Sequence, residues 1–259
     1  MACVTVAAFE VKTPQRQVTA VRGRPALLQC LFTPGSDSSL NDLVITWQRA
    51  DSSRVLHSFY YGVDQLGQQS SHYHNRTRMN SSELLTGNAS LLLFDVGPSD
   101  EGQHMCTVSN SKGTDKAVVQ LNYGAFYTEP RLTIAIDSAN LIIQYESEGY
   151  PEPDIEWKDL SGQNLTHKSQ ILQDNQDQGL LKLNTLLTAD PSQGVNFTFT
   201  LRNPLLHQVL ERIVTLHHVF QKDHGTCPRE RLAILSPILL FFLIIFVLLC
   251  PAIGKKVAK

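Results

Sequence analysis

The sequence predicts an all-β protein followed by one membrane-spanning helix, and three observations carry this prediction. Cys30 and Cys106 lie 76 positions apart with Trp47 between them. Short runs of alternating apolar and polar residues, separated by Gly, Pro, Asn and Ser, fill most of the chain before residue 217. Residues 232–253 are a stretch of 22 residues without a charge. The 259 residues provide for about two domains of ordinary size.

The two cysteines and the tryptophan predict an immunoglobulin sandwich in the first half. In that fold a disulfide joins strands of the two facing sheets, and a tryptophan packs against it. The run Asp100–Cys106 adds a turn glycine and an inward side chain two positions before the second cysteine, where the fold normally has tyrosine. Here that side chain is His104. We expect a Cys30–Cys106 disulfide and a core with Trp47 and His104, in a variable-type domain over residues 9–122.

Alternation of apolar and polar residues places the strands of this domain. They are expected at 9–13, 25–31, 43–48, 54–61, 89–95, 103–109 and 115–121. On the third of these, Leu43, Ile45 and Trp47 share one face, because side chains alternate across a strand. Val44, Thr46 and Gln48 then share the opposite face.

The second half predicts a constant-type sandwich over residues 128–217, and this sandwich lacks its disulfide. Its expected strands are 131–136, 140–146, 155–157, 178–188 and 195–201, with a Gly-Tyr-Pro turn before Trp157. Tyr145 and Phe199 occupy the two positions at which cysteines would stand. We therefore expect Tyr145, Trp157 and Phe199 to fill the core, and this domain to be the less stable one. A disulfide contributes roughly 3–5 kcal/mol to the stability of a domain. A pair of packed aromatic rings contributes less than this beyond the free energy of its buried area.

Residues 232–253 predict a transmembrane helix. As a helix they span roughly 33 Å, against about 30 Å of hydrocarbon. Because a disulfide forms in an oxidising compartment, the N-terminal domain is expected outside the cell, in a single-pass protein of the plasma membrane. Residues 218–231 form a stalk and 254–259 a cytoplasmic tail. Residues 1–8 lack the basic start and the long apolar run of a secretory signal. We expect the true signal peptide to be missing or replaced.

The chain as a whole resembles the B-seven/butyrophilin family of T-cell co-signalling ligands, and within it the branch of the third B-seven homologue. The runs that carry the resemblance are 57–59, 73–77, 85–91, 100–102, 149–151, 179–180 and 201–204, in the right order through both domains. The resemblance implies a membrane ligand that binds a receptor on T or other immune cells and modulates their activation. His104 and the missing second disulfide depart from the family pattern.

The resemblance also implies a contact surface on the variable-type domain. Its candidate residues are Gln48, His57, Tyr60, Tyr61, Met105, Thr107 and Lys112. Tyrosine and methionine are enriched in interface cores. The alternative reading is that some of the residues from His57 to Tyr61 face the core, because alternation turns about half of them inward.

Five Asn-x-Ser/Thr sequons predict a glycosylated chain: Asn75, Asn80, Asn88, Asn164 and Asn196. Cys227 in the stalk has no partner in either domain, so it is a candidate for an intermolecular disulfide in a homodimer. The opposite reading is an unpaired thiol.

Other classes of function have less support in the sequence. The net charge of −2 and the lack of a basic patch argue against nucleic acid. No histidine, cysteine and carboxylate spacing suits a metal, a cofactor or catalysis, so we expect none of these. An adhesion molecule that makes homophilic contacts is the main alternative, and a degenerate paralogue is a third. Receptor identity, the sign of the signal and the oligomeric state stay open.

Overall fold

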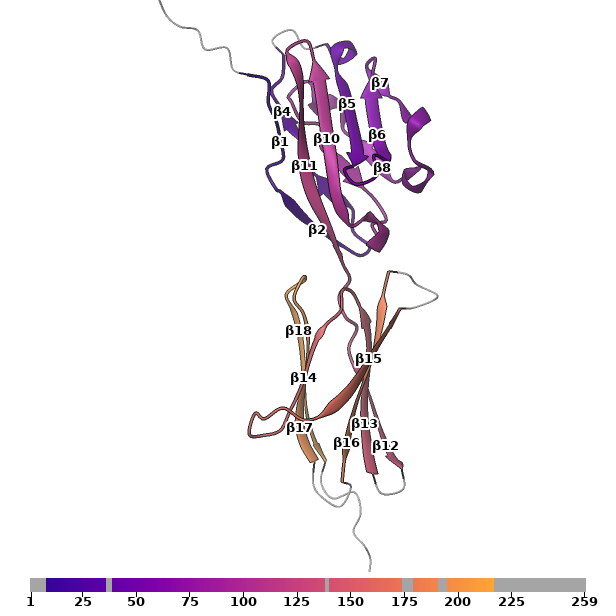
Figure 1. Ribbon diagram of the computed structural model, residues 1–259, viewed down its shortest axis with the longest axis vertical. Coiled ribbons are helices and arrows are strands. Elements are labelled where there is room, and N and C mark those ends of the chain that lie inside the picture. Colours follow the sequence, from indigo (N-terminus) through magenta and orange to yellow (C-terminus); the bar gives the residue numbers. More distant parts are fainter. Residues whose placement is uncertain (1–7, 36–38, 138–139, 174–178, 191–194, 217–259) are drawn as a thin grey trace, which may run out of the picture. The chain divides into compact units, whose positions relative to one another are not determined.

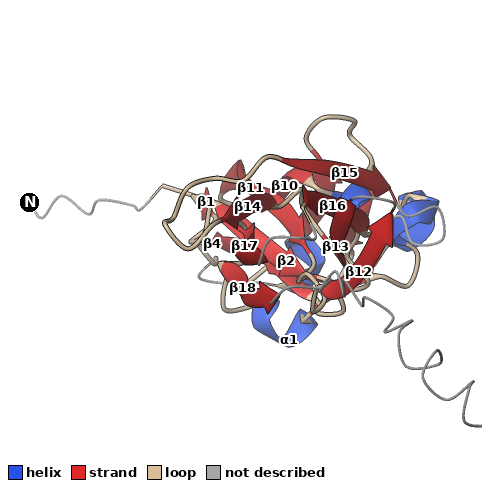
Figure 2. Ribbon diagram, turned by 90° about the horizontal axis from the view of Figure 1, so that it is seen from below, coloured by secondary structure: helices blue, strands red, loops and turns tan. Residues whose placement is uncertain are grey.

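The computed structural model of the chain describes residues 8–35, 39–137, 140–173, 179–190 and 195–216. The described part is built almost wholly of strands, and its helices are short (Figure 2). Two sandwiches follow one another along the chain, which confirms the predicted all-β tandem architecture (Figure 1). In the described residues no helix is long and apolar enough to span a membrane. The predicted span, 232–253, lies outside them, as do the stalk and the tail.

The first sandwich has a large sheet of six strands in the order β2-β11-β10-β5-β6-β7. These strands are β2 (Gln17–Val21), β5 (Val44–Arg49), β6 (Val55–Tyr60), β7 (Val63–Asp64), β10 (Gly102–Asn110) and β11 (Gly113–Gly124). All neighbours are antiparallel except β2 and β11, which run parallel. In Figure 1, β11, β10 and β5 lie side by side in the middle of this sheet.

The facing sheet is smaller, and short helical turns connect it to the large one. It consists of β3 (Ala26–Leu28), β9 (Leu91–Leu93) and β8 (Thr77–Met79), and β1 (Val11–Lys12) pairs separately with β4 (Leu31–Phe32). The helical turns are η1 (Leu40–Asp42), η2 (Leu66–Gln68), η3 (Ser71–Tyr73), α1 (Ser81–Leu84) and η4 (Pro98–Asp100).

The core of the first sandwich forms around the predicted disulfide. The two Sγ atoms of Cys30 and Cys106 are 2.06 Å apart, which confirms that pair. Trp47 is fully buried beside them, and its Nε1 donates to the carbonyl of Ala89 at 2.9 Å. Ile45 and Trp47 are buried while Val44, Thr46 and Gln48 are not, as alternation along this strand requires. The strand β5 therefore gives one face to the core and the other to solvent.

The second sandwich pairs a sheet of four strands with one of three. The four-stranded sheet has the order β12 (Arg131–Asp137), β13 (Asn140–Gly149), β16 (Leu181–Ala189), β15 (His167–Gln173). The three-stranded sheet has the order β14 (Asp154–Lys158), β17 (Val195–Asn203), β18 (Gln208–Leu216). All these neighbours are antiparallel.

An aromatic cluster fills the core of the second sandwich. The rings of Tyr145 and Phe199 stack with their centroids 4.3 Å apart and their planes 22° from parallel. Trp157 lies 5.0 Å from Phe199 and 5.1 Å from Phe197. Its Nε1 donates to the hydroxyl of Thr185 at 3.0 Å, so the one polar atom of the indole is satisfied inside the core.

Five strands were not expected from the sequence: β2, β7, β8, β15 and β18. The strand β2 follows Pro14, and β15 and β18 come after stretches with weak alternation. Both β15 and β18 lie at a sheet edge, where side chains are mostly exposed or half-exposed and the apolar pattern fades. Propensity alone predicts such edge strands poorly.

Candidate functional site

The solvent side of the six-stranded sheet is the candidate site, and we call it the front face. Strand register arranges its side chains in three rows across β11, β10, β5 and β6. These rows are Val118–Met105–Gln48–Val55, Lys116–Thr107–Thr46–Ser58 and Thr114–Ser109–Val44. The alternate residues of β10, His104, Cys106 and Val108, are buried in the core.

The front face carries little charge and mixes apolar side chains with uncharged polar ones. Among its eleven row residues only Lys116 carries a charge. Val44 and Val118 expose 44% and 40% of their surface. Protein interfaces are depleted of charge at their centres and enriched in aromatic residues and methionine. Three predicted contact residues, Gln48, Met105 and Thr107, lie together in the first two of these rows.

A tyrosine hairpin forms one edge of the front face. Strand β6 ends at Tyr60, and Tyr61-Gly62 is the two-residue turn into β7, with Tyr60 paired to Val63. Tyr61 and Gly62 both have positive φ, 54° and 78°, as the turns that suit a two-residue hairpin require. A bulky residue rarely adopts such a backbone. The turn exposes 77% of Tyr61, and its ring meets that of Tyr60 edge to face at 5.3 Å.

His57 does not belong to this surface, and its prediction as a receptor contact is wrong. It is 1% exposed and points into the sandwich, because it pairs with the buried Trp47 and lies two residues before the buried Phe59 on the same strand. Its Nδ1 is 3.0 Å from Thr77 Oγ1, and its Nε2 is 3.0 Å from Asp64 Oδ1. Through its Nδ1, His57 therefore links β6 to β8.

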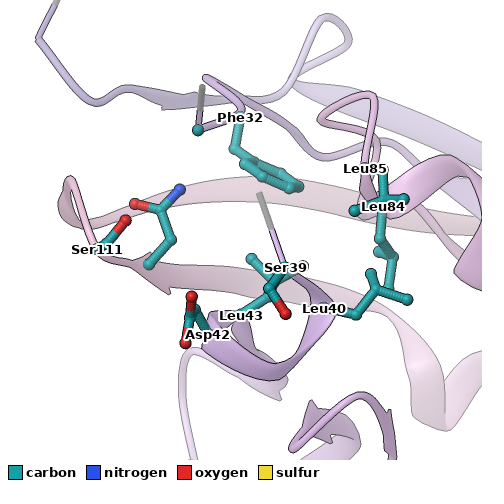
Figure 3. Close-up of a pocket in the computed structure, with 10 residues that line it drawn as sticks. Phe32, Ser39, Leu40, Asp42, Leu43, Leu84, Leu85 and Ser111 are labelled. Carbon is teal, nitrogen blue, oxygen red and sulfur yellow. The ribbon is translucent and has the colours of Figure 1, made fainter. Parts of the chain in front are cut away.

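The β10–β11 turn closes one end of the front face. Lys112 is exposed there, and its Nζ donates to the carbonyl of Pro34 at 3.1 Å. A cavity of about 20 Å³ lies at this end, between Phe32, Leu84, Leu85 and the Ser39–Leu43 turn (Figure 3). That volume holds about one water. The cavity is too small for an organic ligand, so this end offers surface contact only.

A buried ion pair braces the sheet at the start of β10. Burial raises the pKa of Asp100, but hydrogen bonds from Arg76 and from the Gly97 amide outweigh it and hold the pKa below its usual value. Arg49 donates to the carbonyls of Asp100 and Glu101. These contacts fix the turn that leads into β10.

His104 lies in the core at the position where this fold normally has tyrosine. Its Nδ1 is 3.2 Å from the carbonyl oxygen of Gly102, and its Nε2 has no hydrogen-bond partner among the described residues. Burial, and then the charge of Arg49, lowers the pKa of His104 to about 4. The side chain is therefore neutral at physiological pH.

The five sequons differ in how they present their amide nitrogen. Asn75 is exposed in a turn, and Asn164 is exposed at an isolated β-bridge to Lys158. Asn80 caps α1, and its Nδ2 donates to Glu83, as does the Nδ2 of the half-buried Asn88. The Oδ1 of Asn196 on β17 is buried. Glycosylation stays a prediction, best suited to Asn75 and Asn164. Cys227 lies outside the described residues.

The tyrosine turn is the part of the site that reasoning from the sequence missed. Alternation predicted a continuous strand from Arg54 to Tyr61, whereas the chain reverses at Tyr61-Gly62. The available signal was Gly62 followed by a second short apolar-polar run, which is typical of a hairpin turn.

Comparison with known proteins agrees with this architecture. Residues 13–123 match the immunoglobulin V-set domain family, and residues 128–211 match the family described as butyrophilin subfamily 3 member A2-like, Ig-C domain. The chain is therefore a two-domain member of the immunoglobulin superfamily. Mouse butyrophilin subfamily 1 member A1 is 29% identical over 214 residues, which cover 82% of this chain and 40% of that protein. The chain thus spans less than half the length of that relative.

One further relative and one solved structure are similar to the chain over both of its domains. Mouse programmed cell death 1 ligand 1 is 26% identical over 249 residues, which cover 94% of this chain and 83% of that protein. A chain in the crystal structure of ICOS in complex with ICOS-L and an anti ICOS-L VNAR domain is 26% identical, with a TM-score of 0.67. That match covers 78% of this chain and 100% of the other. The chain is therefore similar to B7 and butyrophilin proteins over both of its domains.

Proposed function

We propose that this chain is a membrane-anchored ligand that binds a receptor on T or other immune cells through its front face. The observation that carries the proposal is the composition of that face beside the tyrosine hairpin. The first two rows bring Met105, Thr107 and Gln48 together with Lys116 as their one charged residue, and the adjoining hairpin exposes Tyr61. A large aromatic side chain next to a flat, weakly charged surface is the composition of an interface hot spot.

The backbone supports the proposal as well. Positive φ at a bulky residue such as Tyr61 costs free energy, and it persists only where the surroundings enforce it. Here the pairing of β6 with β7 on either side of the two-residue turn imposes it. The hairpin therefore presents Tyr61 in one conformation before a partner arrives, which lowers the entropy cost of binding.

The relatives support the same class of function. One relative bears the name of a ligand, and one solved structure is of ICOS in complex with ICOS-L. Membrane anchoring comes from residues 232–253 of the sequence. The polarity of the signal and the identity of the receptor are not part of the proposal.

Vesicles that carry the full-length chain test the proposal by their binding to activated immune cells. Tyr61→Ala should weaken binding about tenfold or more, because truncation of a hot-spot residue costs at least 1–2 kcal/mol. The midpoint of thermal unfolding should stay unchanged, since Tyr61 makes little contact with the core. Leu27→Ala is the matched control, because Leu27 is 43% exposed on the facing sheet.

Two results would contradict the proposal. One is equal binding by the Tyr61→Ala, Leu27→Ala and unmodified chains. The other is aggregation of the vesicles with one another in the absence of cells, which would favour the adhesion reading.

A further inference from the structure

The outer strand of the second domain, β12, is an uncovered sheet edge. Within the described residues it pairs with β13 alone, and all seven of its residues are exposed. Leu132, Ile134 and Ile136 expose 36%, 42% and 44% of their surface. An edge strand of this kind displays a row of backbone N–H and C=O groups that can pair with another strand.

The apolar residues of β12 lie on the core side of the sheet. Leu132, Ile134 and Ile136 stand opposite Tyr145, Ile143 and Leu141 of β13, which are all buried. Cross-strand partners share a face of the sheet, so the apolar stripe of β12 continues the core outward and is exposed in the part of the chain that the structure describes. Proteins commonly protect such an edge with a charge or a proline in the middle of the strand. Here charges stand only at the two ends, Arg131 and Asp137.

The positions of those charges make the strand complementary to itself. We propose that β12 is the pairing surface for a second copy of this chain, with the two strands antiparallel and Ile134 opposite Ile134 of the second copy. In that register Arg131 stands opposite Asp137 of the second copy, and the same pair forms again at the other end. Thr133 then stands opposite Ala135.

Other registers lose this complementarity. A shift of two residues places Arg131 opposite Ala135 of the second copy, so neither Arg131–Asp137 pair across the two strands can form. In the proposed register the apolar stripes of both copies lie on one face and meet at Ile134, because antiparallel partners keep the same face. The two four-stranded sheets would become one sheet of eight strands.

The opposite edge of the same sheet lacks these features. Strand β15 has the sequence His167-Lys-Ser-Gln-Ile-Leu-Gln173, with a lysine near one end and no acidic residue. Antiparallel self-pairing centred on Gln170 would set Lys168 opposite Leu172. This edge has no opposite-charge pair to offer, so β15 serves as the internal control.

A charge-swap experiment tests the proposal on the purified full-length chain in detergent micelles. Cys227 is replaced by serine throughout, so that no stalk disulfide contributes, and the dimer dissociation constant is measured by sedimentation. Arg131→Asp alone, or Asp137→Arg alone, places like charges opposite each other at both ends. Each should raise the dissociation constant about tenfold. The double variant R131D/D137R restores both pairs and should return the constant to within about threefold of the parent.

A cross-linking arm shows whether pairing occurs at the proposed register. Mild oxidation of Ile134→Cys should give a covalent dimer, because residues opposite each other in antiparallel strands lie about 4.5–5.5 Å apart. Gln170→Cys on β15 is the matched control and should stay monomeric. A monomeric parent at all concentrations, or equal cross-linking at both edges, would overturn the proposal, as would a double variant that remains as weak as the singles. Thermal unfolding of each variant checks its fold. The inference does not rest on the front face, so Tyr61→Ala should leave the dimer constant unchanged.

Discussion

In the first sandwich the facing sheets are joined by the Cys30–Cys106 disulfide, whereas in the second sandwich stacked Tyr145 and Phe199 rings lie between them. Each core keeps one buried tryptophan, Trp47 or Trp157. In both cases the indole nitrogen donates a hydrogen bond inside the core. The two domains therefore share the fold and the tryptophan but differ in what occupies the space between the sheets.

The difference separates two sources of stability. A disulfide acts mainly on the unfolded chain, whose conformational entropy it reduces. Stacked rings act in the folded state, through buried area and close packing. The first domain should therefore respond to redox conditions, and the second only to changes in the shape of its core. The candidate site lies on the first domain, where a covalent link holds the two sheets together.

The largest expected effect is truncation of the stack. Phe199→Ala should destabilise the second domain by about 3–5 kcal/mol, because it removes a fully buried ring that contacts both Tyr145 and Trp157. Hydrogen exchange resolved by peptide should show lost protection in β13 and β17, with β10 unchanged. Leu160→Ala is the control, since Leu160 is 73% exposed. Equal loss of protection in both domains would contradict the claim that the two cores are stabilised separately.

Removal of the disulfide should have the next largest effect, in the other domain. The variant with Cys30→Ala and Cys106→Ala should lose about 2–5 kcal/mol of stability in the first domain. Denaturant unfolding followed by hydrogen exchange should place that loss in β5 and β10. Protection in β17 should match that of the parent chain, and a comparable loss there would show that the cores are coupled.

Acid should distinguish the two cores through His104. Its pKa is about 4 in the folded chain and about 6.5 when unfolded. Because the folded pKa is the lower one, the unfolded chain binds a proton at His104 first. The free energy of unfolding is therefore highest above about pH 6.5 and decreases as the pH falls toward 4. The first domain should lose on the order of 3 kcal/mol over that window. His104→Phe should weaken the pH dependence of the first domain's stability. A pH dependence that persists in the variant would show that other groups cause it.

The fold could be predicted from the sequence because it depends on a disulfide and on the alternation of apolar and polar residues along each strand. The Cys30–Trp47–Cys106 spacing fixes which strands face each other, and alternation along β5 predicts which side chains point inward. The paired replacement of cysteines by Tyr145 and Phe199 also follows from position alone. Strands β2, β15 and β18 could not be predicted, because a strand at a sheet edge needs no strong apolar pattern.

The candidate site was less predictable because it depends on tertiary detail. Gln48, Met105 and Thr107 follow from alternation and lie on the front face. His57 was misplaced because which half of the residues from His57 to Tyr61 faces the core depends on strand pairing, and His57 pairs with the buried Trp47. The exposure of Tyr61 depends on the conformation of a two-residue turn, which apolar periodicity does not encode.

The central claim is that recognition belongs to the front face of the first domain, and that the second domain supports it. The most direct test compares immune-cell binding by vesicles that carry Tyr61→Ala or Phe199→Leu, with the stability of each domain measured in parallel. Tyr61→Ala should lose most binding with both domains intact. Phe199→Leu should keep binding while its second domain loses stability. Loss of binding by Phe199→Leu with full binding by Tyr61→Ala would contradict the account.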